Sequence, residues 1–158
     1  MRVMSTKTQK RSVKFTVQGT PDAIFICYCS HCKKNAGAPG QIASLKSPSD
    51  FQDLILTISQ SAKFKCENVH VLEGSEHINT WILKDNLSGC EKHKKFCSRC
   101  GCTLWTIPMK HSGSHWIVRT ALLENGFDKF PYKAEFFASR KMPVAAAVVK
   151  SFDTMPDA

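Results

Sequence analysis

Polar and apolar residues alternate in short runs along much of the chain, and an alternation of period two is the pattern of β-strands with one buried face. The run SVKFTVQG at 12–19 shows it most clearly. The run AIFICYC at 23–29 is apolar and predicts a buried strand that ends in cysteines. Further strand-like runs lie at 68–74, 77–84, 103–108, 115–124 and 132–141. The pattern predicts a mainly β domain of antiparallel sheets with short helices.

Signals for helices are few. Ser30 is a suitable N-cap and Gly37 with Pro39 ends the segment, so we expect one or two helical turns there, with amides directed at the nearby cysteines. The run SPSDFQDLI at 47–55 opens with a second helix-start signal. The segment 85–95, DNLSGCEKHKK, is predicted to be a polar loop in which EKHKK is a solvated basic stretch.

The length of 158 residues is that of one ordinary domain, and the chain holds no repeat or low-complexity block at which to divide it. We therefore predict a single domain over 1–158. Within it we expect a flexible segment at 1–11 and a C-terminal tail at 144–158. The sequence assigns no oligomeric state.

Basic residues outnumber acidic ones by 22 to 13, which gives a formal net charge of +9. Such a surface attracts anions. The chain carries neither a recognition-helix pattern nor an aromatic RNA-binding motif, so a small anionic substrate is favoured over nucleic acid. No secretory signal and no apolar run long enough for a membrane span are present, so we expect a cytoplasmic protein, with a mitochondrial presequence as the minor alternative.

In a reducing compartment, the eight cysteines are better interpreted as thiolate sites than as a disulfide framework. Cys27, Cys29 and Cys32 form a CxCxxC motif, in which the first two share a face of an extended segment and the turn that follows brings back the third. Three thiolates with one open position are typical of a catalytic zinc, whereas structural zinc has four protein ligands. The alternative is a four-thiolate structural site completed by a cysteine of the second motif.

That second motif is a CxxCG turn, or zinc knuckle, formed by Cys97, Cys100 and Gly101. Two intervening residues allow both sulfurs to face one tetrahedral ion, and the glycine allows the backbone to turn. The motif predicts a metal-binding pair.

The two motifs lie in the segments VKFTVQGTPDAIFICYCSHCKKNAGAP and KKFCSRCGCTLW, and with IVRTALLENG, KAEFFASRK and FDTMP they cover nearly the whole chain. In these segments the chain resembles the glutathione-dependent formaldehyde-activating enzyme family, which includes centromere protein V. The resemblance implies an Mss4-like, tent-shaped β fold. It also implies that Cys27, Cys29 and Cys32 hold a catalytic zinc that accepts a glutathione thiol, and we assign the catalytic role to Cys29.

The family has a second, structural zinc, held by the knuckle cysteines and by a CxC at the start of the first strand. This chain has Thr8 and Lys10 at those two positions, so half of that site is missing. The replacement ligands to consider are Cys102, Cys90 and Cys66; alternatively, Cys97 and Cys100 bind no metal or join the first cluster. A further departure is Tyr28, where the family usually has histidine.

The resemblance implies a zinc-dependent carbon-sulfur lyase that acts on a glutathione, or other thiol, adduct of an aldehyde or related carbonyl compound. The alternatives are a zinc Lewis-acid enzyme that uses no glutathione and a non-catalytic zinc module that binds a partner. Lys33, Lys34 and Arg119 are candidates to pair with glutathione carboxylates. The histidines His31, His93, His111 and His115 are expected to be exposed loop residues, and the tryptophans Trp81, Trp105 and Trp116 to lie in the core.

Overall fold

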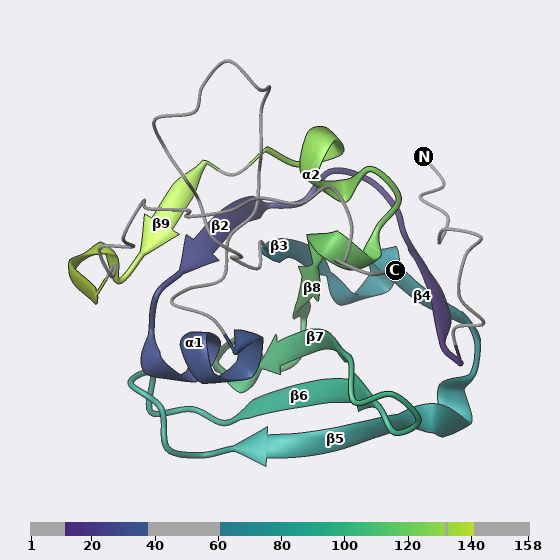
Figure 1. Ribbon diagram of the computed structural model, residues 1–158, viewed down its shortest axis with the longest axis horizontal. Helices are drawn as coiled ribbons and strands as arrows, with labels where there is room; N and C mark the ends of the chain where they lie inside the picture. Colours follow the sequence, from purple (N-terminus) through teal and green to yellow (C-terminus); the bar gives the residue numbers. More distant parts are fainter. Residues whose placement is uncertain (1–11, 38–60, 132, 141–158) are drawn as a thin grey trace, which may run out of the picture.

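The computed structural model describes residues 12–37, 61–131 and 133–140, which form a mainly β structure (Figure 1). The strands are β1 Lys14–Val17, β2 Ala23–Cys27, β3 Ser61–Lys65, β4 Val69–Glu73, β5 Ile78–Leu83, β6 Lys92–Cys97, β7 Thr103–Pro108, β8 His115–Arg119 and β9 Ala134–Phe136. The helices are α1 Ser30–Ala36 and α2 Gly126–Lys129, with 3₁₀ turns η1 Cys66–Asn68, η2 Ser75–His77, η3 Met109–His111, η4 Thr120–Leu122 and η5 Ala138–Arg140. The predicted mainly β class is confirmed.

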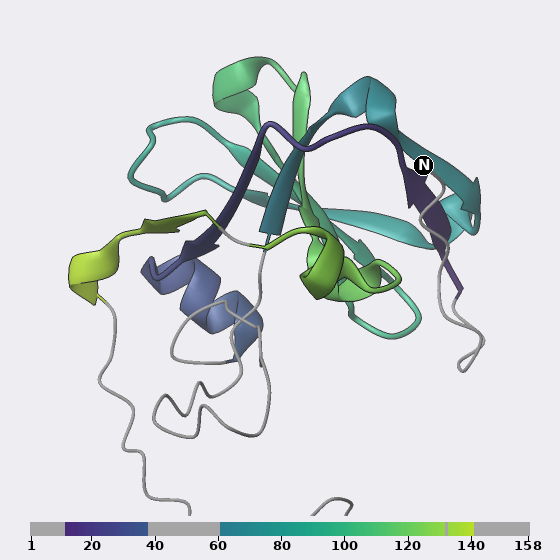
Figure 2. The ribbon, with the colours of Figure 1, turned by 90° about the horizontal axis from the view of Figure 1, so that it is seen from above.

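The described strands form a two-stranded sheet, β1-β4, and a seven-stranded sheet in the order β5-β6-β7-β8-β3-β2-β9. Helix α1 directly follows β2 and also reaches β6, because the Lys94 ammonium donates a hydrogen bond to Asn35 of α1 at 3.2 Å. Since β2 and β6 lie four places apart in the sheet, the sheet must curve to bring both to the same helix. Figure 1 shows α1 between β2 and β6, and Figure 2 shows it on one side of the sheet, close to β2.

One strand pairing differs from the expected antiparallel arrangement. β9 pairs with β2 in parallel, with Phe25 opposite Ala134 and Cys27 opposite Phe136. The connection from β2 to β9 runs through most of the domain, so no tight turn forces the two strands to run in opposite directions. This pairing places Phe136 beside the cysteine-bearing end of β2.

The core joins the two sheets through aromatic contacts. Trp105 of β7 is 2% exposed, stacks on Trp116 at 5.1 Å between ring centroids, and meets the edge of Phe15 from β1 at 5.2 Å. The prediction that Trp105 is in the core is confirmed, and Trp116 packs against the core while partly exposed. The prediction for Trp81 is wrong, because its side chain is 55% exposed on β5 and covers the Lys94 ammonium instead of entering the core.

Three further sequence predictions need correction. EKHKK was expected in a solvated loop, but β6 begins at Lys92 and Lys94 is buried. Long lysine stems can cover apolar surface inside a sheet, which an interpretation from charge alone overlooks. Strand β3 was not predicted, although it lies between β8 and β2, and the expected turn 125–131 contains α2.

The helix predicted at 47–55 and the end segments 1–11 and 144–158 lie outside the described residues. The single-domain boundary of 1–158 therefore stays a prediction. Within the described ranges, no helix is both long enough and apolar enough to cross a membrane.

Candidate functional site

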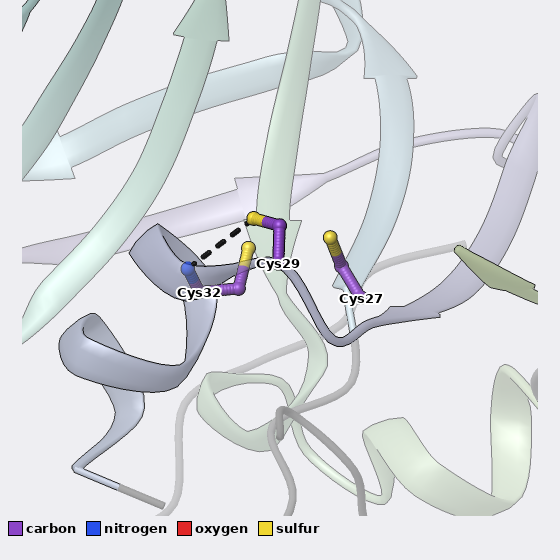
Figure 3. A group of neighbouring side chains, drawn as sticks. All are labelled: Cys27, Cys29 and Cys32. Atoms are coloured by element: carbon purple, nitrogen blue, oxygen red, sulfur yellow. Dashed lines mark hydrogen bonds between the residues drawn. The ribbon is translucent and has the colours of Figure 1, made fainter. Parts of the chain in front are cut away.

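The three cysteines of the first motif meet where β2 ends and α1 begins. The Sγ atoms of Cys27, Cys29 and Cys32 all lie within 4.8 Å of one another, and Figure 3 shows the three side chains directed to one side of the β2–α1 junction. Thiolates around a tetrahedral zinc are about 3.8 Å apart, since Zn–S bonds are about 2.3 Å long. A small contraction of this cluster would therefore surround one ion.

The start of α1 is built on Cys29. Its backbone is extended, with φ −65° and ψ 156°, and its Sγ accepts the Cys32 amide at 3.4 Å, so Cys29 and not the expected Ser30 is the N-cap. The predicted helix and the direction of its amides toward sulfur are confirmed. The helix ends at Gly37, whose φ of 63° lies in the left-handed region that glycine adopts without strain.

The three thiols cannot all ionise at such close range. Hydrogen bonds from the Cys27 and Cys32 thiols hold the pKa of Cys29 far below its usual value, and the Lys92 charge adds to this effect. The same interactions raise the pKa of Cys32, through Cys27 first and then Cys29, and the pKa of Cys27, through Cys29 first. A divalent cation relieves this competition by binding three thiolates together, so the donor set fits a thiophilic metal such as zinc.

The cluster forms part of the wall of a cavity of about 760 Å³. Phe25 of β2 and the neighbouring Phe136 of β9 line it and pack together at 4.5 Å between ring centroids. Among the histidines, His31 and His111 line the cavity. The prediction of exposed loop residues is wrong for His93 and His115, which lie half-buried on β6 and β8 against Glu91 and Asp22, at 3.3 and 3.0 Å.

Among the residues that the structure describes, five basic side chains also line the cavity. Arg119 lines the cavity, as proposed for glutathione binding, whereas the described cavity wall does not include Lys33 or Lys34. Sequence reasoning missed Lys94 and Asn35, which also line it. Polar and apolar residues do not alternate in KHKKFC, so the sequence offered no local signal that Lys94 faces inward.

Tyr28, at the position where the family usually has histidine, is 2% exposed. Its hydroxyl donates a hydrogen bond to Glu135 Oε1 at 2.8 Å, and its amide donates to the Phe136 carbonyl at 3.0 Å. Tyr28 therefore anchors β9 beside the cluster instead of offering a ligand to it.

The knuckle has the turn expected from its sequence. The Gly101 amide donates to the Cys97 carbonyl at 2.8 Å, and Gly101 has φ 72°. Burial raises the pKa of Cys97, but the amides of Arg99 and Cys100 outweigh this effect and lower it overall. The amides at this turn are thus directed at sulfur, as in zinc knuckles.

No third ligand joins this pair within the described ranges, where the only group of three or more candidate ligands is Cys27, Cys29 and Cys32. Neither Cys102, Cys90 nor Cys66 completes the knuckle there, and neither knuckle cysteine joins the first cluster. The assignment of Cys97 and Cys100 as metal ligands stays a prediction.

Replacing Cys100 with serine is expected to change the free energy of unfolding by less than about 0.5 kcal/mol, because Cys100 is exposed and a structural zinc needs four ligands. Thermal unfolding and zinc content of the purified variant provide the measurement. A loss of one zinc equivalent relative to the unaltered chain would instead show that the pair binds a second ion.

Comparisons with known proteins support the family and the fold. Residues 9–140 match the family model described as glutathione-dependent formaldehyde-activating enzyme. A crystal structure of a Rhodobacter sphaeroides protein is similar with a TM-score of 0.54 at 14% identity, over 85% of this chain and 99% of that chain, which shows a shared fold. The comparison with curated proteins finds no match.

Proposed function

The chain belongs to the glutathione-dependent formaldehyde-activating enzyme family, and from that premise we propose that it is a zinc-dependent carbon-sulfur lyase acting on a glutathione adduct of an aldehyde. The observation that carries the proposal is the group of three thiols at the wall of a cavity. Cys27, Cys29 and Cys32 would hold the ion, and Cys29 is the residue to which we assign the catalytic role. Three protein ligands would leave one coordination position for a small molecule.

In the reversible reaction, the thiol sulfur of glutathione bonds to the carbonyl carbon of formaldehyde and the thiol proton is transferred to the carbonyl oxygen. The product is S-(hydroxymethyl)glutathione, and the reverse reaction breaks the same carbon-sulfur bond. Zinc, when bound, lowers the pKa of a coordinated thiol and polarises a carbonyl oxygen.

The chain's own residues would contribute to binding the substrate. Phe25, Phe136 and Phe137 give the cavity an apolar wall beside the cluster, which strengthens electrostatic interactions inside it. His31, inside the motif, lines the same cavity, where its imidazole could exchange protons with a bound adduct. We assign His31 no catalytic role beyond that position.

The test is an assay of S-(hydroxymethyl)glutathione formation and cleavage by exchange NMR, with zinc-loaded chain, glutathione and formaldehyde. We expect exchange faster than the spontaneous reaction, and a loss of that acceleration in Cys29→Ser. The matched control is Cys90→Ser, since Cys90 is a free thiol outside the cavity wall and its replacement should leave the rate unchanged.

Exchange no faster than the spontaneous rate, with zinc bound, would contradict the lyase assignment. If small thiols and carbonyls also leave the metal unaffected, the non-catalytic binding module is the better account. If a carbonyl compound is converted without glutathione, the better account is a zinc Lewis-acid enzyme.

A further inference from the structure

Lys94 is a buried cation in the wall of the cavity. Its side chain is 8% exposed, its ammonium donates to Asn35 Oδ1 at 3.2 Å, and it lies 5.1 Å from the centre of the Trp81 ring. Burial lowers its pKa, and no carboxylate pairs with it among the described residues. Taking an ammonium out of water costs several kcal/mol when no counter-charge compensates it. The negative charges of Cys32 and Cys29 offset part of this cost, and once a metal takes up those charges an anionic ligand can supply the partner of Lys94.

Asn35 extends this donor group toward the cysteines. It lies three residues after Cys32 on α1, so the two side chains are neighbours on one face of the helix. Its Oδ1 accepts from Lys94 and also from Thr103 Oγ1 at 3.5 Å. Because an ammonium can only donate, Oδ1 is the atom that faces Lys94, and Asn35 also lines the cavity.

Arg119 supplies a second buried cation to the same wall. It is the last residue of β8, is 8% exposed, and places one guanidinium nitrogen 3.4 Å from Ser61 Oγ. A guanidinium is planar and always charged, which suits a carboxylate better than a thiolate or a neutral group.

The charge of the whole cavity wall favours an anionic ligand. Its basic residues are Lys92, Lys94, Lys110, Arg119 and Arg140, and its only described acidic residue is Asp85. Three thiolates around one divalent ion carry a single net negative charge. The cations therefore remain in excess even with a metal bound, and neutralising the cluster does not account for all of them.

We propose that Lys94, Asn35 and Arg119 form a carboxylate subsite beside the thiol cluster, and that this subsite selects anionic thiols and their adducts over neutral ones. All three residues supply donors, and a carboxylate supplies only acceptors when ionised. Glutathione and its S-adducts carry two carboxylates, so the subsite would fix one of them while the sulfur faces the cysteines. The inference rests on the proposed function only for the identity of this ligand.

The test measures binding without a reactive thiol. S-methylglutathione keeps both carboxylates but cannot offer a free sulfhydryl, and its diethyl ester removes the negative charges. We expect isothermal titration of the zinc-loaded full-length chain to show that the acid binds at least about tenfold more tightly than the ester, since hydrogen bonds to charged groups contribute more than neutral ones.

In Lys94→Met, which keeps the apolar stem, affinity for the acid should fall by about tenfold or more, and the difference between acid and ester should shrink to match. Lys94→Arg should restore part of the difference. The matched control is Lys95→Met, because Lys95 is the next residue of β6, donates to Thr80 Oγ1 at 2.6 Å and is not part of the cavity wall. It should bind as the unaltered chain does.

Equal binding of acid and ester by the unaltered chain, or no binding of either, would overturn the proposal, and this comparison needs no variant. An unchanged affinity for S-methylglutathione in a folded Lys94→Met variant would also overturn it. A failed exchange assay with intact acid-ester discrimination would reject the lyase and keep the subsite. Accelerated exchange with equal binding of acid and ester would reject the subsite and keep the lyase.

Discussion

Replacing Cys29 with serine is expected to lower the affinity of the chain for zinc by about a hundredfold. Zinc bound by four ligands contributes about 10–16 kcal/mol, or on the order of 3 kcal/mol per ligand, and about 1.4 kcal/mol corresponds to a factor of ten. Cys29 is one of only three candidate ligands that the described residues bring together. Competition with a chromophoric chelator gives the measurement.

Serine is a suitable replacement because it separates metal binding from folding. Cys29 is also the N-cap of α1, where its Sγ accepts the Cys32 amide, and serine is among the best N-cap residues. The helix should therefore persist in Cys29→Ser, as judged by circular dichroism. Cys90→Ser is the matched control and should bind zinc as the unaltered chain does. Equal zinc affinity in both variants would show that Cys29 is not a ligand.

Replacing Trp105 with alanine is expected to reduce the free energy of unfolding by about 3–5 kcal/mol, the usual loss for a large buried aromatic side chain. Trp105 contacts Phe15 of the two-stranded sheet and Trp116 of the seven-stranded sheet, so its removal leaves a cavity between the two. In a chain of this length the melting temperature should fall by on the order of 10 °C.

The control for this prediction is Trp81→Ala. The sequence suggested that both tryptophans lie in the core, but Trp81 is 55% exposed and its ring contacts the Lys94 ammonium. Its loss should cost at most about 1 kcal/mol. Thermal unfolding of both variants in the same buffer is the measurement, and similar losses of stability in the two would contradict the packing described.

The thiol cluster was predictable because it is local. Cys27, Cys29 and Cys32 span the end of one strand and the first turn of one helix, so their spacing alone brings their sulfurs together. The knuckle turn at Cys97 was predictable for the same reason, since Gly101 fixes the backbone there.

The rest of the cavity wall depends on contacts between distant segments. Lys94 reaches the site because β6 comes near α1, and Phe136 reaches it because β9 pairs with β2 in parallel. No local pattern in KHKKFC or AEF specifies these neighbours. The charge of the segment EKHKK also led to a wrong prediction. A lysine-rich segment is usually solvated, whereas here Lys94 is buried against Trp81 and Asn35.

The central claim is that Cys27, Cys29 and Cys32 hold a zinc ion with one place left for an external ligand. X-ray absorption at the zinc edge tests it most directly, since it counts the sulfur neighbours of the metal with and without glutathione. We predict one zinc with three sulfurs and one lighter atom, and four sulfurs once glutathione is added. Four sulfurs before the addition, with no change after it, or no zinc retained by Cys27, Cys29 and Cys32, would contradict the account.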